Sequence, residues 1–213
     1  MIITIDGPAG SGKSTVAKLL AKRLTVRFLD TGAMYRAVAL AVLQAGAEEA
    51  DAQAVAKIAR EIDISFDNGT VVLNGVGVDL KIRTPEVTAI SSVVAANPVV
   101  RTRLVELQRS VARQGSLVTE GRDQGSVVFP DAEFKFFVTA SVDARARRRH
   151  REMIGSGSSL TLSTVRTQLQ QRDARDENRA HAPMKPADDA VILDTSDMSI
   201  AQVVETVATM VEE

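Results

Sequence analysis

The residues best suited to chemistry lie near the start of the chain, in a glycine-rich segment that reads GPAGSGKST. It fits the pattern G-x-x-x-x-G-K-[ST], whose glycines let successive backbone N–H groups curl around an anion without Cβ clashes. A lysine at the position of Lys13 can reach the β- and γ-phosphates of a nucleotide, and the hydroxyl of Ser14 can bind Mg²⁺. The pattern predicts a nucleotide-binding phosphate loop formed by Gly7, Pro8, Ala9, Gly10, Ser11, Gly12, Lys13, Ser14 and Thr15.

The elements beside this phosphate loop (Gly7–Thr15) match what the motif requires. Met1–Ile5 is a short apolar run typical of a buried strand, and Val16–Leu24 carries apolar residues at helical spacing. A strand, a glycine-rich loop and a helix that begins at the phosphates form the expected arrangement, because the helix N-terminus favours anions. A glycine-rich turn without a ligand is the alternative, and the flanking strand and helix argue against it.

The rest of the chain alternates between strand and helix patterns, which predicts a parallel α/β sheet. Phe28–Gly32 is expected to be extended up to its glycine. Further strands are expected at 117–119, 134–138 and 190–193, and helices at 34–46, 50–60, 98–113, 162–172 and 200–211. Thr84 before Pro85 predicts the start of another helix.

A small antiparallel β unit interrupts this alternation. Asn68-Gly69 separates two extended runs, 62–66 and 70–73, and Asn74-Gly75 offers a second turn. We therefore expect a core domain from residues 1–30 and 101–213, an insertion at 31–100, and a short lid at 148–160 that includes a Gly/Ser-rich stretch.

Composition excludes several function classes. The chain has 213 residues, a formal net charge of −1 and 3% aromatic residues, so neither a basic field nor stacking platforms predict binding to a nucleic acid polymer. It contains no cysteine, which excludes disulfides and thiol catalysis and is compatible with the reducing cytoplasm, the compartment we expect. No apolar run approaches the ~18 residues that a membrane span needs.

Arginines occur where a phosphoryl transfer would use them. Arg122 follows a predicted buried strand, and spacings of three and four residues place Arg172, Arg175, Asp176 and Arg179 on one face of a helix. Fixed cations stabilise the negative charge that spreads over the transferred oxygens. A solvated face with i,i+4 ion pairs is the alternative, and the phosphate loop favours the functional interpretation.

A second basic run holds five arginines, at positions 145, 147, 148, 149 and 151. It fits a nucleic-acid patch, a helix leading to a lid over bound phosphates, or a charged helix surface. We expect most of these arginines to be surface residues and Arg148 to contact ATP.

Two acids could lie beside the metal ion. Glu120 and Asp194 each end a predicted strand, and we prefer Glu120 because Gly121 after it leaves room for close approach of a ligand. The only histidines, His150 and His181, have no nucleophile beside them in sequence, so a Ser/His/Asp site has no local support.

Six segments in order along nearly the whole chain resemble the bacterial cytidylate kinases: Gly7–Thr15, Leu29–Arg36, Ile82–Val87, Glu120–Asp123, Val127–Ala132 and Arg172–Arg179. The phosphate loop alone is shared by many superfamilies. The segments D-[ST]-G-A-x-Y-R and G-R-D-x-G-[ST]-V-V-F-P-D-A, which begin at Asp30 and Gly121, are much more specific.

The resemblance implies a P-loop nucleoside monophosphate kinase fold: a five-stranded parallel sheet flanked by helices, a small monophosphate-binding insertion with antiparallel β structure, and a short lid. It implies transfer of a phosphoryl group from ATP, with Mg²⁺, to CMP or dCMP in pyrimidine metabolism. It places Lys13, Arg122, Arg172 and Arg179 at the chemical step and Ser14 and, through water, Glu120 at the metal. The implied CMP-binding residues are Thr31, Tyr35, Arg36, Ser92, Arg101, Arg122, Asp123, Asp176 and Arg179.

Two positions depart from the family pattern: Glu120 stands where Asp is common, and Thr31 where Ser is common. The residues alone predict only an ATP-dependent phosphotransferase with an anionic acceptor, expected to be a monomer. A kinase of another small anion, such as a shikimate-like acid, therefore stays open. A regulatory GTPase would need an N-K-x-D guanine reader, and none of the seven lysines lies in one.

Overall fold

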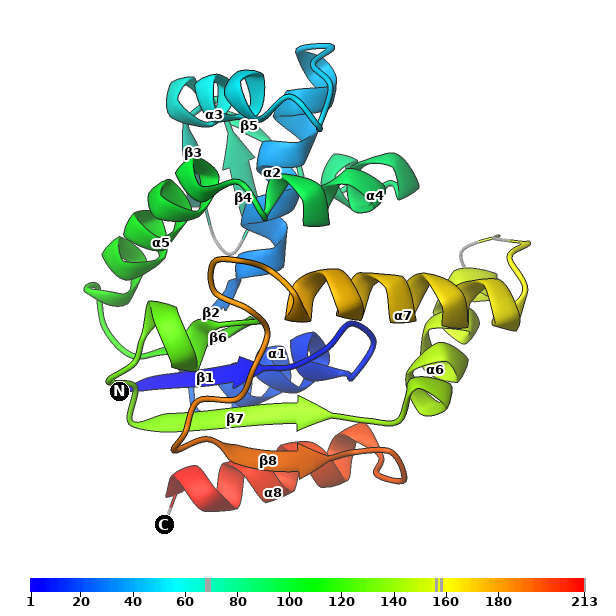
Figure 1. Ribbon diagram of the computed structural model, residues 1–213. Coiled ribbons are helices and arrows are strands. Elements are labelled where there is room, and N and C mark those ends of the chain that lie inside the picture. The colour runs from blue at the N-terminus through cyan, green and yellow to red at the C-terminus, as the bar shows by residue number, and fades with distance from the viewer. Residues whose placement is uncertain (68–69, 156, 158, 213) are drawn as a thin grey trace. The chain divides into compact units, whose positions relative to one another are not determined.

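The computed structural model describes residues 1–67, 70–155, 157 and 159–212. The chain forms two compact units, one from Met1–Phe28 with Gly115–Glu213 and the other from Leu29–Gln114 (Figure 1). Among the described residues, no helix combines the length and the apolar character needed to cross a membrane.

A five-stranded sheet carries the first unit. Its strands stand in the order β2 (Arg27–Asp30), β6 (Leu117–Gly121), β1 (Ile2–Asp6), β7 (Phe134–Thr139) and β8 (Val191–Asp194), which confirms the predicted parallel α/β sheet. β1 pairs in parallel with β6, with Asp6 opposite Gly121, and with β7 on its other side. The carboxyl ends of β1 and β6 therefore lie level, which brings the segments that follow them to the same edge of the sheet.

Helices α1 (Lys13–Arg23) and α8 (Ile200–Glu212) pack on this sheet and bury its core. The cluster joins Ile3 and Ile5 of β1 to Leu20 of α1 and Val207 of α8, all of them fully buried. Helices α6 (Val142–Gly155) and α7 (Leu162–Glu177) pack against each other through a separate cluster that includes Ala9 of the phosphate loop. The loop thus rests on packed helices.

The second unit combines helices with a small antiparallel sheet. Its helices are α2 (Thr31–Gln44), α3 (Ala52–Glu61), α4 (Pro85–Val94) and α5 (Pro98–Ala112), with a short 3-10 helix η1 (Lys81–Arg83) before α4. Strands β3 (Ile64–Asp67), β4 (Thr70–Leu73) and β5 (Val76–Gly77) pair antiparallel, as predicted. Asn74 and Gly75 both adopt positive φ, 49° and 78°, which confirms the second turn. The predicted Asn68-Gly69 turn lies outside the described residues.

Three local predictions were wrong. The extended stretch ends at Asp30 and not at Gly32, because the Asp30 carboxylate caps α2 by accepting from Ala33 N at 2.8 Å. Helix α7 continues beyond Arg172 to Glu177, so Arg179 lies past its end and the four predicted residues do not share one helix face. A π-helical turn, η2 (Gln124–Val128), follows β6 where no element was predicted.

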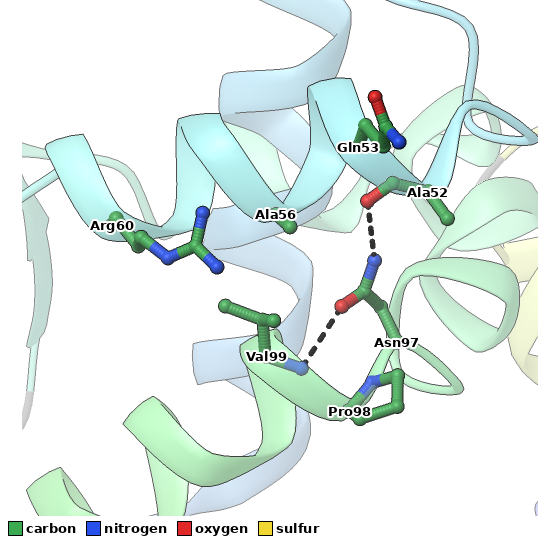
Figure 2. A pocket seen from close by; sticks show the side chains of 7 residues that line it. All are labelled: Ala52, Gln53, Ala56, Arg60, Asn97, Pro98 and Val99. Carbon is green, nitrogen blue, oxygen red and sulfur yellow. Dashed lines mark hydrogen bonds between the residues drawn. The ribbon is translucent and has the colours of Figure 1, made fainter.

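A pocket of about 460 Å³ lies between α3, along residues 52–60, and the start of α5 (Figure 2). Asn97 caps α5 there, and its amide also donates to Ala52 O at 2.9 Å. None of its lining residues belongs to the predicted site.

Candidate phosphoryl-transfer site

The phosphate loop runs from the end of β1 to the start of α1, which is the predicted strand–loop–helix arrangement. Gly7, Gly10 and Gly12 have φ values of 141°, 77° and 92°, a region that residues with a Cβ rarely adopt. A Cβ on Gly7 would also stand 2.1 Å from the carbonyl oxygen of Val138 in β7. The glycines of the motif are therefore required by the backbone conformation, and Gly7 also by the close approach of β7.

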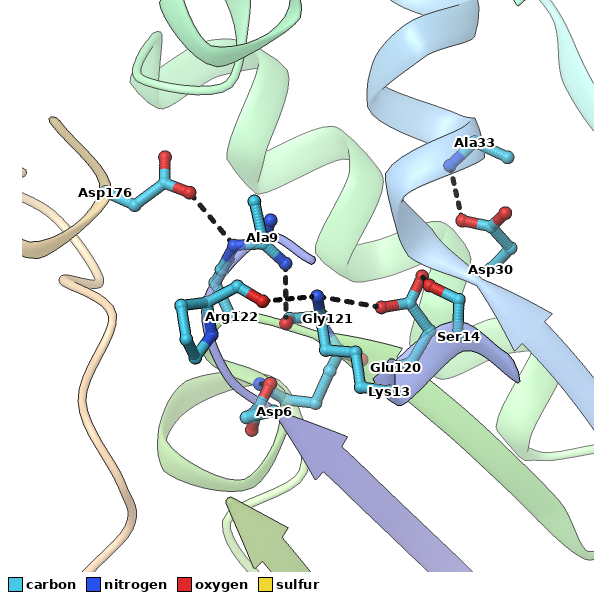
Figure 3. A network of polar contacts seen from close by, with 12 residues as sticks. Asp6, Ala9, Lys13, Ser14, Asp30, Ala33, Glu120, Gly121, Arg122 and Asp176 are labelled. Carbon is cyan, nitrogen blue, oxygen red and sulfur yellow. Dashed lines mark hydrogen bonds and ion pairs between the residues drawn. The ribbon is translucent and has the colours of Figure 1, made fainter. Parts of the chain in front are cut away.

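Lys13 is buried at the first position of α1. Its Nζ donates to Pro8 O at 3.1 Å and stands 3.8 Å from Glu120 Oε2 (Figure 3). Burial, followed by the charge of Arg122, lowers the pKa of Lys13 to about 7, against the opposite effect of Glu120. Crowding of cations lowers the lysine pKa because it raises the cost of one more positive charge. The same crowding makes this a favourable place for an anion.

Ser14 and Glu120 lie side by side although they are far apart in sequence. Ser14 is an exposed residue, and its hydroxyl donates to the buried Glu120 Oε1 at 2.9 Å (Figure 3). A hydroxyl and a carboxylate oxygen are hard ligands of the kind that Mg²⁺ takes beside phosphate oxygens. The residues present therefore fit a magnesium ion at this point.

Asp194, the alternative acid, has a different local role. Its Oδ1 accepts from both the backbone N (2.9 Å) and the hydroxyl (2.6 Å) of Ser196, and it ends the edge strand β8. These hydrogen bonds lower the pKa of Asp194. The geometry favours Glu120 over Asp194 as the metal-side acid.

Asp176 gathers two of the predicted arginines. Its Oδ2 accepts from Arg122 Nε at 2.9 Å (Figure 3). Its Oδ1 accepts from Arg179. Burial alone would raise the pKa of Asp176, but Arg122, Arg179 and Arg172 together hold it below its usual range. Burial likewise works against the charge of Arg122, yet Asp176 and Glu120 raise its pKa overall. The carboxylate stays ionised and fixes both guanidinium groups.

Asp123 and Arg172 complete the predicted residues of this unit. Asp123 is buried at the end of β6, next to Arg122. Arg172 is half-buried on α7, and its charge lowers the pKa of both Lys13 and Asp176, which places it among the same charges. The first unit thus brings together Lys13, Ser14, Glu120, Arg122, Asp123, Arg172, Asp176 and Arg179.

Two arginines of the basic run on α6 donate hydrogen bonds to backbone carbonyl oxygens of the phosphate loop. Arg145 is an exception to the expectation that most of these arginines are surface residues: it is buried, donates to Ala9 O at 3.1 Å and pairs with Asp173 at 2.5 Å. Arg148 donates to Ser11 O at 3.3 Å and to Thr195 Oγ1 at 3.2 Å. The other arginines, at 147, 149 and 151, are exposed as predicted.

Sequence reasoning missed Asp6. This residue ends β1, is 4% exposed, and accepts from Gln124 N at 2.9 Å and Gly125 N at 2.8 Å. Burial raises its pKa to about 7 although both backbone donors act in the opposite direction. It fixes the turn that follows Asp123, and an acid directly before Gly7 at a strand end was the signal available in the sequence.

The second unit holds the remaining predicted residues. Thr31, Ser92 and Arg101 are buried polar residues on α2, α4 and α5. The guanidinium of Arg101 lies 5.9 Å from the centre of the Tyr35 ring, within cation–π range. Arg36 pairs with Asp30 at 3.2 Å.

A parallel α/β sheet with this loop, a neighbouring hydroxyl–carboxylate pair and clustered arginines defines a P-loop phosphotransferase. The family model described as Cytidylate kinase matches residues 3–213. The cytidylate kinase of Citrifermentans bemidjiense is 46% identical over 100% of this chain and 93% of its own length. That of Mycobacterium leprae is 46% identical over 100% of this chain and 96% of its own.

The chain therefore belongs to the cytidylate kinase family. It is an ATP-dependent kinase of CMP and dCMP. The solved structure of an uncharacterized protein from Eubacterium ventriosum is similar with a TM-score of 0.52 and 14% identity, covering 100% of this chain and 99% of that chain. At that identity it supports the fold alone.

Proposed function

We propose that this chain transfers the γ-phosphoryl group of magnesium-bound ATP directly to the phosphate of CMP or dCMP, giving ADP and CDP or dCDP. The observation that carries the proposal is the cluster of Lys13, the Ser14–Glu120 pair and the Arg122–Asp176–Arg179 group at the carboxyl ends of β1 and β6. It combines a phosphate loop, oxygen ligands for a metal ion and fixed cations for the transferred group.

On the ATP side, backbone N–H groups of Gly7–Thr15 bind the phosphates and Lys13 binds the β- and γ-phosphates. To do so, Lys13 Nζ exchanges its bond to Pro8 O for phosphate oxygens. Arg148 remains the proposed ATP contact of α6. Its guanidinium donates to Ser11 O of the phosphate loop and to Thr195 Oγ1, which supports a place beside the bound phosphates.

Ser14 and, through a water molecule, Glu120 would hold the magnesium ion of MgATP. When bound, Mg²⁺ offsets negative charge on the β- and γ-phosphates. The longer side chain of Glu120, where Asp is common in the family, leaves its carboxylate next to the Ser14 hydroxyl at 2.9 Å. That contact supports the assignment despite the departure from the family pattern.

On the CMP side, the resemblance assigns residues of both units. Arg36, Arg101 and Arg122 suit the acceptor phosphate, because a guanidinium group can bind phosphate oxygens in pairs. Ser92, Arg101, Asp123 and Asp176 suit the cytosine and the ribose, and Thr31 and Tyr35 complete the set. A carboxylate can accept from the exocyclic amine of cytosine, which uracil lacks, and this favours CMP over UMP.

In this mechanism, a phosphate oxygen of CMP attacks the γ-phosphorus in line, and the bond from that phosphorus to the β–γ bridging oxygen breaks. No side chain forms a covalent intermediate. Arg172 and Arg179 stabilise the charge on the transferred oxygens, and Arg179 is held for this by Asp176. Positioning and fixed charge supply the rate enhancement.

Two further parts of the proposal concern closure of the insertion and the lid, and the compartment and oligomeric state of the protein. Residues 31–100 act as the monophosphate-binding insertion and 148–160 as the lid, and their closure excludes water, which competes as acceptor. We also propose a cytoplasmic location, since the substrates are phosphorylated metabolites of the cell interior, and a monomeric state. Light scattering during gel filtration would test the monomer.

A coupled assay of ADP release tests the function, with MgATP and a panel of CMP, dCMP, UMP, AMP, GMP and shikimate. We expect fast turnover with CMP and dCMP and slow turnover with UMP. ADP release that does not depend on any monophosphate would contradict the proposed acceptor. Dependence on shikimate would favour the small-anion kinase instead.

A further inference from the structure

One carboxylate of the second unit holds two arginines and a helix end at once. Asp30 Oδ1 accepts from Ala33 N at 2.8 Å, which caps α2. Its Oδ2 stands 3.2 Å from Arg36 Nη2 and 3.6 Å from Arg83 Nη2. Arg36 is the arginine assigned to the acceptor phosphate, whereas Arg83 has no assigned role.

The Arg83 side chain is largely exposed, so few contacts restrict its movement. Arg83 is the last residue of η1, and its side chain is 60% exposed, compared with 18% for Arg36. A separation of 3.6 Å in solvent is a loose ion pair, which contributes about 0–1 kcal/mol to stability. A contribution to folding stability therefore does not explain why the Arg83 side chain lies next to Asp30.

We propose that Arg83 is a further arginine for the acceptor phosphate of CMP, beside Arg36, and that the Asp30 carboxylate takes the place of this phosphate until CMP binds. The inference rests on the proposed function. Because Arg36 and Arg83 share one oxygen of Asp30, an anion bound to Arg36 also lies within reach of Arg83. A phosphate carries more negative charge and one more oxygen than a carboxylate, so it can compete for both arginines.

Two details of Arg36 support the exchange. Its buried Nε has no hydrogen-bond partner among the protein atoms, so the carboxylate leaves part of its donor set for another acceptor. Gly32 keeps space open beside it, because a Cβ there would stand 2.9 Å from Arg36 Nη1 and 3.2 Å from Asp30 Oδ1. The segment is thus arranged so that Arg36 can be approached and can reorient.

The test compares Arg83→Ala with Lys81→Ala, an exposed cation of the same short helix that has no part in the proposed site. The full chain is assayed for kcat, for KM of CMP and of ATP, and for inhibition by cytidine, which has the same base and ribose but no phosphate. We expect Arg83→Ala to raise KM for CMP about tenfold, with KM for ATP and the inhibition constant of cytidine unchanged. Lys81→Ala should match the wild type, and Arg83→Lys should restore part of the loss.

The outcomes separate the inference from the function. Wild-type KM for CMP in Arg83→Ala overturns the inference, and so does an equal loss for CMP and cytidine, which indicates a role in the fold or in base binding. Calorimetric binding of CMP to each variant gives the same comparison without turnover. A wild-type chain that binds CMP without phosphorylating it overturns only the proposed function, and one that does neither overturns both.

Discussion

Replacing Asp6 by asparagine should change how stability depends on pH. The Asp6 carboxylate is buried at the end of β1 and accepts two backbone N–H groups from the turn that follows Asp123. The charged groups that face it are Asp123, which raises its pKa, and Arg122, which lowers it. Burial is the larger effect and raises the pKa from 3.8 to about 7.

The sign follows from proton binding. Between pH 3.8 and about 7, the native state keeps a proton on Asp6 that the unfolded chain has released. The stability that Asp6 contributes is therefore complete below the unfolded pKa and is lost as pH rises through the folded pKa. The shift corresponds to about 4 kcal/mol in total, of which about 3 kcal/mol is lost between pH 5 and pH 8.5.

The Asp6→Asn variant has a similar shape but no such ionisation. Its amide nitrogen meets one of the two backbone N–H groups, which costs about 1–3 kcal/mol through a lost hydrogen bond. The variant should thus be less stable than the wild type at pH 5, and the difference should shrink or reverse by pH 8.5. Urea unfolding followed by circular dichroism at several pH values measures both chains. A difference that stays constant from pH 5 to pH 8.5 would refute the assigned ionisation.

Three further substitutions test the site itself. Lys13→Ala should lower kcat by at least about 10²–10³-fold with an unchanged circular dichroism spectrum, and wild-type turnover in the folded variant would exclude the loop mechanism. Asp176→Asn should lower kcat about tenfold or more because Arg122 loses its anionic partner, and should reduce the preference for CMP over UMP; equal kinetics with both chains would remove this role. Gly32→Ala should raise KM for CMP by displacing Arg36 while the melting temperature stays equal or rises, since alanine favours a helix; a lower melting temperature with normal KM contradicts this.

Features whose residue types directly select a local backbone conformation were predicted correctly from the sequence. The phosphate loop needs glycine at fixed positions and a strand and a helix around it, so its place followed from residue types alone. The Asn74-Gly75 turn and the Thr84 cap were predicted for the same reason, because the residue types select the backbone conformation. In each case the interaction spans only a few residues of the chain.

Predictions were wrong where a distant or a capping partner decides the outcome. The start of α2 was missed because Thr31 and Gly32 were counted with the extended stretch, although Asp30 before them is a good N-cap. The burial of Arg145 was not foreseen, since only the fold brings it to Ala9 O and Asp173. Asp6 gave no signal beyond its place, because its partners are 118 and 119 residues away.

Each unit of the chain contains one aspartate that pairs with two arginines. Asp176 holds Arg122 and Arg179 in the first, and Asp30 holds Arg36 and Arg83 in the second. A carboxylate with two arginines keeps the guanidinium groups ordered and limits the repulsion between them, so that less conformational entropy is lost when a phosphate binds. The ion pairs of Asp176 are better shielded from solvent than those of Asp30, because the Asp176 side chain is 1% exposed and the Asp30 side chain 17% exposed. The buried pair therefore suits fixed charge stabilisation during transfer, and the more accessible pair suits an exchange in which the substrate phosphate replaces the carboxylate.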